Sequence, residues 1–212
     1  MLGCGSPGRA WATVTQVTEG RRHYRYVGPA HVLAEVRPGS EGEPIGSPSA
    51  LAAWLTARDA DERSEPFTFV IGLNGVLRLA PRRSEHVACA GGEPVLSAGE
   101  ITFLPDPDGW AVGEVSNQST GYCPDPSSWP AVGIALDGAA LKHPARFTDP
   151  IVFRRCPKCA ERNLVKDDDF TCAICGEDLP DSWNLDPRDD DSPRAQRHAG
   201  LAPTGQDLGV TD

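Results

Sequence analysis

Two closely spaced cysteine pairs constrain this sequence more than any other feature. Cys156 and Cys159 are separated by two residues, and Cys172 and Cys175 repeat that spacing after a further twelve residues. Each pair directs two sulfurs toward one point, and a short hairpin between the pairs brings the two points together. This arrangement is typical of a tetrahedral Zn²⁺ site, so we expect these four cysteines to bind zinc.

The segment from Cys156 to Gly176 resembles the zinc-ribbon family, in which two Cys-x-x-Cys knuckles lie at the ends of a β-hairpin. The resemblance implies hairpin strands at Arg162 to Val165 and at Phe170-Thr171, with Asp167-Asp168-Asp169 at the turn. Ala160 stands where many ribbons carry glycine, and it could loosen the first knuckle. Four thiolates fill the coordination of zinc, so the expected role of the metal is structural.

Composition indicates one ordinary globular domain with a small appendage. The 212 residues are 39% hydrophobic and carry a formal charge of −10, with no segment basic enough for an obvious nucleic-acid footprint. Arginine outnumbers lysine by 17 to 3, which favours a GC-rich bacterial source.

Cysteine usage and hydropathy predict the compartment. The three remaining cysteines, at positions 4, 89 and 123, are an odd number scattered far apart, which favours a reducing cytoplasm over a disulfide framework. The first fifteen residues lack a secretory signal. No apolar run approaches the ~20 residues needed to cross a bilayer, so we expect no membrane span.

Residue patterning predicts an α+β fold, a mainly antiparallel sheet with two or so helices. A helix is expected from Ser47-Pro48 to about Arg58, and a second from Ser128 with Val132 and Leu136 on its inner face. Asn74-Gly75 predicts a type I′ turn in a hairpin. Strands are expected at 11–18, 23–27, 30–36, 67–73, 76–79, 95–96, 100–104, 110–115 and 151–153.

The same patterns divide the chain into three parts. Residues 1–150 form the expected α+β body, and residues 151–183 form the ribbon. Residues 184–212 contain Asp189-Asp190-Asp191 and almost no large apolar side chains. Such a segment buries too little surface to offset its ordering entropy, so we predict a disordered acidic tail.

The stretch 82–92 is rich in groups that are useful in a catalytic site. If it is an extended strand, Glu85 and Cys89 point away from His86, which then needs a partner from elsewhere. His86 and Glu85 are therefore candidate catalytic residues of a pocket built from two segments. The alternative is an edge strand with solvated charges and a buried Cys89.

The stretch 115–125 supplies the second half of such a pocket. Cys123 and Ser119 are candidate nucleophiles, whereas Asn117, Gln118 and Tyr122 could bind a small polar or nucleotide-like ligand. The alternative is a turn-rich connection whose polar side chains satisfy their own backbone. A further alternative is a second metal held by His86, Cys89 and Cys123.

These observations favour a zinc-containing cytoplasmic binding or adaptor protein, with a structural ribbon that docks a protein partner. No phosphate-binding loop, nucleophile elbow, zincin helix or dinucleotide fingerprint is present, which argues against the common enzyme classes. One alternative is an enzyme with a pocket at 82–92 and 115–125. Nucleic-acid binding through the ribbon is less expected, because acids outnumber bases there.

Overall fold

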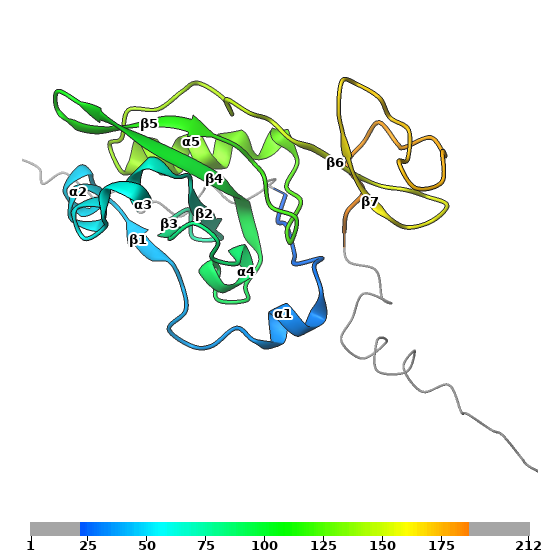
Figure 1. The fold of residues 1–212 in the computed structure, drawn as a ribbon, viewed down its shortest axis with the longest axis horizontal. Helices are drawn as coiled ribbons and strands as arrows, with labels where there is room; N and C mark the ends of the chain where they lie inside the picture. Colours follow the sequence, from blue (N-terminus) through cyan, green and yellow to red (C-terminus); the bar gives the residue numbers. More distant parts are fainter. Residues whose placement is uncertain (1–21, 187–212) are drawn as a thin grey trace, which may run out of the picture.

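A five-stranded antiparallel sheet organises the first part of the chain. The computed structural model describes residues 22–186, and we call residues 22–150 the body and 151–186 the C-terminal module (Figure 1). The sheet has the strand order β1-β3-β2-β4-β5. Its strands are β1 (Glu43–Ile45), β2 (Phe67–Gly72), β3 (Leu77–Ala80), β4 (Val95–Asp106) and β5 (Gly109–Val115). The predicted α+β class with a mostly antiparallel sheet is therefore confirmed.

Helices and loops cover both faces of this sheet. On one face, Leu51 and Leu55 of α2 and Leu136 of α5 join the larger apolar core. On the other face, Val87 of α4 packs with Tyr24 and Tyr122 in a smaller core. The helices are α1 (Ala30–Ala34), α2 (Pro48–Thr56), α3 (Ala60–Ser64), α4 (His86–Cys89), η1 (Pro126–Ser128) and α5 (Trp129–Gly138).

Strand β2 lies at the centre of the body because it is apolar on both faces. Phe69 and Ile71 enter the larger core, whereas Val70 enters the smaller one. All three side chains are fully buried. A strand covered on both faces reads as a continuous apolar run rather than as an alternation, which explains the pattern of this segment.

The helix predicted from Ser47-Pro48 is α2. The Ser47 side chain accepts a hydrogen bond from the backbone N–H of Ala50, and Pro48 occupies the first helical turn. The second predicted helix is α5, which buries Val132 and Leu136 as expected.

The strand predicted at 30–36 is wrong, because this segment forms α1. Backbone N–H groups of Val32 and Glu35 donate to Pro29 and His31, which closes one helical turn. Val32, Leu33 and Val36 pack against the smaller core. Val36 follows Leu33 by three residues and Val32 by four, a spacing that fits one face of a helix better than one face of a strand.

The predicted extended conformation of 82–92 is also wrong, because its centre forms α4. The backbone N–H of Cys89 donates to the carbonyl of Glu85, and that of Ala90 donates to His86. The helix ends at Gly91 and Gly92, which have φ angles of 65° and 84°. Glycine accepts these left-handed angles without steric cost, so the two glycines terminate the helix.

The hairpin between β2 and β3 forms where Asn74-Gly75 predicts it, but with a different turn. The N–H of Gly75 donates to the carbonyl of Gly72, and the N–H of Gly72 donates to Val76. Gly75 has a φ of 76°, whereas Asn74 has no positive φ. A type I turn followed by a left-handed glycine thus replaces the expected type I′ turn.

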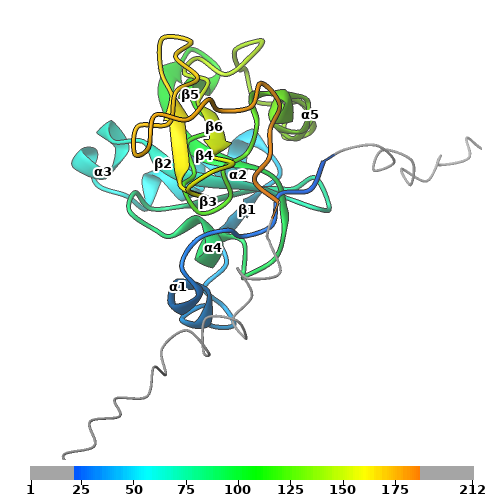
Figure 2. The ribbon, with the colours of Figure 1, turned by 90° about the vertical axis from the view of Figure 1, so that its right-hand side faces the viewer.

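The C-terminal module contains a two-stranded antiparallel sheet, β6 (Val152–Arg155) and β7 (Arg162–Val165). It lies beside one end of the body sheet, and a quarter-turn of the view places β6 and β7 in front of it (Figures 1 and 2). The expected strand 11–18 and the predicted tail from 187 onward fall outside the described residues. Within residues 22–186, no helix reaches the length and apolarity needed to cross a membrane.

Candidate metal centre

The four cysteines of the two predicted pairs meet in the C-terminal module. Their Sγ atoms all lie within 4.8 Å of one another. Cys156 and Cys175 have sulfurs 3.5 Å apart, and those of Cys159 and Cys172 are 3.6 Å apart. Zinc–sulfur bonds of about 2.3 Å place tetrahedral sulfurs about 3.8 Å apart, so the donor set and its spacing fit a metal ion of this kind.

The two knuckles repeat one backbone pattern. The N–H groups of Ala160 and Gly176 donate to the carbonyls of Cys156 and Cys172, at 3.0 and 2.9 Å. The N–H groups of these two cysteines in turn donate to Glu161 and Glu177, both at 2.8 Å. Each knuckle is therefore a closed loop that presents two sulfurs on the same side.

Both knuckles require a left-handed residue directly after the second cysteine. Ala160 has a φ of 64° and Gly176 a φ of 72°. Glycine adopts this angle freely, whereas alanine pays a steric cost through its Cβ. The departure at Ala160 therefore strains the first knuckle without changing its hydrogen-bond pattern.

Asn163 joins the two knuckles, and the sequence analysis did not identify it. Its side-chain amide donates to the carbonyl of Glu161 at 3.0 Å and to the sulfur of Cys172 at 3.5 Å. Its carbonyl oxygen accepts from the backbone N–H of Ala173 at 3.0 Å. The signal in the sequence was an asparagine within a short predicted strand. A buried asparagine needs hydrogen-bond partners, so this position indicates a local structural contact.

Backbone donors favour the thiolate form of Cys172. Burial opposes its ionisation, but N–H groups of Ile174 and Cys175 and the neighbouring thiols donate to its sulfur. The net effect lowers the pKa of Cys172 to about 6. Because thiolate is the form that binds metals, this environment favours metal binding by the Cys172 sulfur itself.

The strand pairing around the site differs from the ribbon expectation. Strand β7 pairs with β6, with Arg155 opposite Arg162, and not with Phe170-Thr171. The first knuckle therefore lies at the turn of the β6–β7 hairpin. The aspartates do form a turn, in which Asp167 and Asp168 have φ angles of 53° and 57°.

A buried arginine attaches the module to the body. Arg154 is 6% exposed, and its guanidinium donates to the carbonyls of Phe153, Pro180 and Asp181 at 2.7–2.9 Å. One of its nitrogens lies 3.6 Å from the carboxylate of Asp125 in the body. Buried charges need such partners, so this contact fixes the orientation of β6.

The ordered chain extends past the predicted start of the tail at residue 184. The Asn184 side chain accepts from the backbone N–H of Arg155 at 2.8 Å and donates to its carbonyl at 2.7 Å. Leu185 is fully buried against Val27, Cys123 and Phe153. These residues therefore belong to the packed structure.

The candidate catalytic residues do not form a hydrogen-bonded set within the described part of the chain. His86 bonds to the backbone carbonyl of Gly99 at 3.0 Å, and burial lowers its pKa. Cys123 is 1% exposed, donates its thiol to the carbonyl of Thr120, and has a pKa raised to about 11 by burial. A protonated, buried thiol is a poor nucleophile.

The other two candidates are placed differently. Ser119 is buried, and its hydroxyl accepts a hydrogen bond from the backbone N–H of Tyr122 at 3.4 Å. Glu85 is exposed and precedes α4, where its side chain makes no capping hydrogen bond. Cys89 is the buried last residue of α4, and desolvation raises its pKa to about 12.

Asn117 is occupied by backbone groups on every side. Its amide nitrogen donates to the carbonyls of Pro124 and Ile151 at 2.6 and 2.7 Å, and its oxygen accepts from the N–H of Ile151 at 2.7 Å. Tyr122 is fully buried and donates its hydroxyl to the carbonyl of Glu93. Both side chains satisfy the fold and leave no group directed at a ligand.

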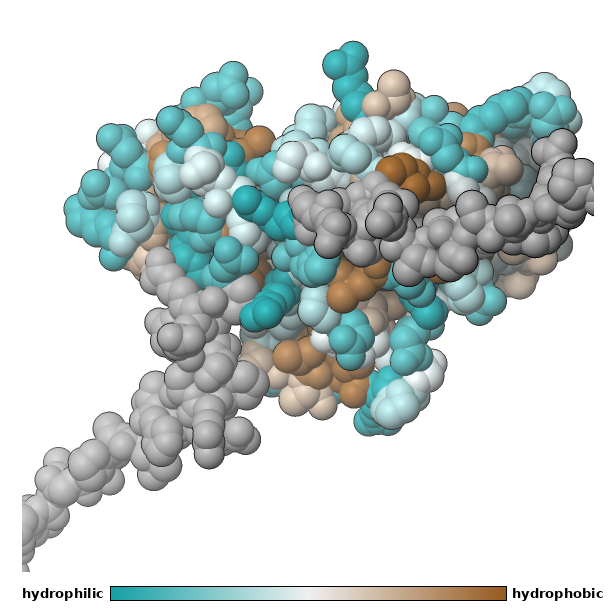
Figure 3. Space-filling view, turned by 180° about the vertical axis from the view of Figure 1, so that it is seen from behind, coloured by the Kyte–Doolittle hydropathy of each residue, from teal (hydrophilic) through white to brown (hydrophobic). Residues whose placement is uncertain are grey.

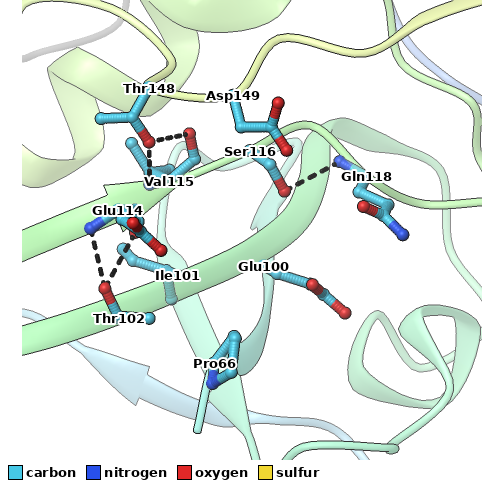
Figure 4. A pocket seen from close by; sticks show the side chains of 10 residues that line it. All are labelled: Pro66, Glu100, Ile101, Thr102, Glu114, Val115, Ser116, Gln118, Thr148 and Asp149. Carbon is cyan, nitrogen blue, oxygen red and sulfur yellow. Dashed lines mark hydrogen bonds between the residues drawn. The ribbon is translucent and has the colours of Figure 1, made fainter.

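Gln118 is the remaining candidate ligand residue, and it lines a small polar pocket between β4, β5 and Thr148-Asp149 (Figure 4). The pocket volume is about 80 Å³. The polar groups around it bond to one another, as when the Glu114 N–H donates to the Thr102 hydroxyl. Ligand pockets usually enclose roughly 300 Å³ or more, so this pocket does not suit a nucleotide-sized ligand.

Comparisons with known proteins do not add a family to these observations. No protein-family model, curated protein or solved structure matches the chain. The cysteine cluster therefore rests on its own geometry.

We expect Ala160→Gly to stabilise the metal-loaded module and Gly176→Ala to destabilise it, each by about 1 kcal/mol. Both residues have positive φ angles, so only the presence of a Cβ changes. Competition with a chromophoric zinc chelator measures the effect as a shift in apparent metal affinity. Equal affinities for the two variants and the natural protein would contradict the proposed strain.

We expect Asn117→Asp to destabilise the protein by about 2–4 kcal/mol, because a carboxylate cannot donate to the two carbonyls that the amide nitrogen binds. Chemical denaturation followed by circular dichroism measures this loss. Exposed Gln118 provides the control, and Gln118→Ala should change the free energy of unfolding by less than about 0.5 kcal/mol. A fully stable Asn117→Asp protein would show that these bonds are dispensable.

Proposed function

We propose that the protein is a cytoplasmic adaptor in which one zinc ion stabilises a C-terminal zinc ribbon that docks a protein partner. The observation that carries the proposal is the convergence of four Sγ atoms within 4.8 Å. Cysteine thiolates at this spacing select zinc over hard cations, which prefer oxygen ligands.

The proposed metal role is structural because the donor set is complete. Cys156, Cys159, Cys172 and Cys175 would hold the ion, whose bound form cross-links the two knuckles. With four protein ligands, no coordination position remains for a water or a substrate. The residues around the ion then orient and close the knuckles, as Asn163 does through its contacts with both.

Two exposed apolar side chains support a docking surface on the module. Ile174 in the second knuckle is 71% exposed, and Leu164 on β7 is 46% exposed. They lie in two different elements, because Ile174 is in the second knuckle, whereas Leu164 follows Asn163 on β7 and points to the opposite side from that buried side chain. Figure 3 shows apolar areas on the surface of the body as well, and Leu104 and Ile134 of the body are 58% and 48% exposed.

The charge around these side chains indicates the kind of partner. Exposed acids of the module lie in the first knuckle, in the turn after β7 and after the second knuckle: Glu161, Asp167, Asp168, Asp169, Asp178 and Asp181. Opposite charge on a partner steers association and selects against acidic surfaces. We therefore assign the surface to a protein with an apolar contact patch and a basic rim.

The basic residues of the module favour this assignment over nucleic acid. Arg154 is buried, Arg162 donates to the body carbonyls of Val27 and Thr120, and Lys158 pairs with Glu177 at 3.1 Å. Phosphate binding requires several cations that converge on one accessible face. Bases that already serve the fold contribute little to such a face.

We expect one zinc ion per chain, measured by native mass spectrometry of protein purified without added metal. Cobalt substitution should give the intense charge-transfer and visible bands of tetrahedral sulfur coordination. Cys172→Ser should unfold the module while the body keeps a cooperative thermal transition, because the two parts have separate cores. Protein without metal, or cobalt with oxygen ligands, would overturn the metal assignment.

We expect Ile174→Asp to weaken capture of basic-surfaced partners without changing metal content. Quantitative crosslinking mass spectrometry in the source cells compares this variant with the natural protein. Leu73→Asp provides the matched control, since Leu73 is 38% exposed but lies in the β2–β3 loop of the body. Equal crosslinking by all three proteins, or crosslinks placed only on the body, would contradict the docking surface.

A further inference from the structure

The last described segment of the chain connects the metal centre to the body, and we call residues 179–185 the strap. At its beginning, Leu179 packs against Cys156 and Cys172, and its backbone N–H donates to Phe170 at 2.7 Å. At its end, Leu185 is fully buried against Cys123 of the body. One short segment therefore contacts both the knuckles and the body.

Trp183 covers Cys123 from the outside. Its indole N–H donates to the Cys123 carbonyl at 2.7 Å. Its ring meets that of Tyr24 edge-on, with centroids 5.3 Å apart, and the Arg22 guanidinium lies 4.5 Å from its centroid. Because Cys123 is 1% exposed, its thiol is accessible only if the contacts around it open.

The position of the strap depends on the second knuckle. The Cys172 backbone N–H donates to the Glu177 carbonyl, and Thr171 forms an antiparallel bridge with Asp178. Leu179 follows directly and completes the small apolar cluster of the module. That cluster has three buried members, two metal ligands and one leucine that packs against them: Cys156, Cys172 and Leu179.

Such a cluster is too small to fold without a cross-link. Small metal-binding units generally lose their structure when the metal is removed, because the ion supplies the folding free energy. The body has two larger apolar clusters that share no residue with the metal centre, and Trp183 of the strap packs at the edge of the smaller one. Loss of the metal should therefore unfold the module and leave the body folded.

We propose that the metal centre is a latch, so that metal occupancy holds the strap over Cys123 and metal loss uncovers the apolar surface around Val27 and Cys123. The latch rests on the proposed binding of zinc. In the loaded state, the strap occupies this surface. In the empty state, the same surface of the body becomes exposed, so that its exposure depends on metal supply or on a competing chelator.

The experiment follows alkylation of single cysteines in the full-length protein by N-ethylmaleimide, mapped by peptide mass spectrometry, before and after metal removal with a chelator. We expect the alkylation rate of Cys123 to rise at least about tenfold, because local opening sets the reactivity of a buried group. Cys89, which is also 1% exposed but is the last residue of α4 and lies in the smaller core, is the internal control and should keep its rate.

Two variants in the metal-loaded protein separate the strap from the metal. Trp183→Ala should raise the alkylation rate of Cys123 while the metal content, measured by native mass spectrometry, stays at one ion. Ile174→Ala, in the second knuckle but away from the strap, should leave the rate unchanged. A Trp183→Ala protein in which Cys123 stays protected would overturn the covering role of the strap.

The outcomes distinguish the latch from the metal assignment. Unchanged alkylation of Cys123 after verified release of the metal would overturn the latch and leave zinc binding intact. A parallel rise at Cys89 together with loss of the cooperative thermal transition of the body would also overturn it, because the opening would then be global. Protein that contains no metal as purified would instead refute the zinc assignment on which the latch rests.

Discussion

Side chains, rather than a shared sheet, satisfy the backbone where the body meets the C-terminal module. Asn117 binds both backbone groups of Ile151 at the entrance to the module. Asn184 binds both backbone groups of Arg155 in the same way, and the Arg154 guanidinium donates hydrogen bonds to two carbonyls of the strap. Buried peptide groups need partners, and here each partner is a single long-range amide or guanidinium. The orientation of the two parts therefore depends on a few side chains. Removing any one of them would leave several buried backbone groups without a hydrogen-bond partner.

These contacts between the body and the module explain why the polar stretch 115–125 resembles a ligand site in sequence. Asn117, Ser119 and Tyr122 are groups that bind substrates well, and they bind backbone equally well when the chain places it within reach. Sequence reasoning left both interpretations open because it had no information about where Ile151 or Glu93 would lie. The deciding contacts span 29 to 34 residues, a separation over which local patterns carry no signal.

The features that sequence did predict have strong local causes. The cysteine spacing brings together the metal ligands, Ser47-Pro48 starts α2, and the apolar run of β2 places it at the centre of the sheet. The errors fall on short segments. Helices α1 and α4 have five and four residues, and one turn of helix contains too few apolar positions to distinguish a period of 3.6 from a period of two. Their conformation is set by packing against the smaller core, which is a tertiary effect.

The two knuckles have the same backbone pattern but are joined to different segments of the chain. A metal ion bound by both knuckles therefore connects β6 with the strap. The first knuckle follows β6, which Phe153 and Arg154 fix to the body. The second is followed by the strap, whose own apolar anchor, Leu179, packs directly on the ligands. The strap also has contacts of its own, through the Arg154 guanidinium, through Asn184 and through buried Leu185. A cross-link between the knuckles therefore connects the contacts of β6 with those of the strap.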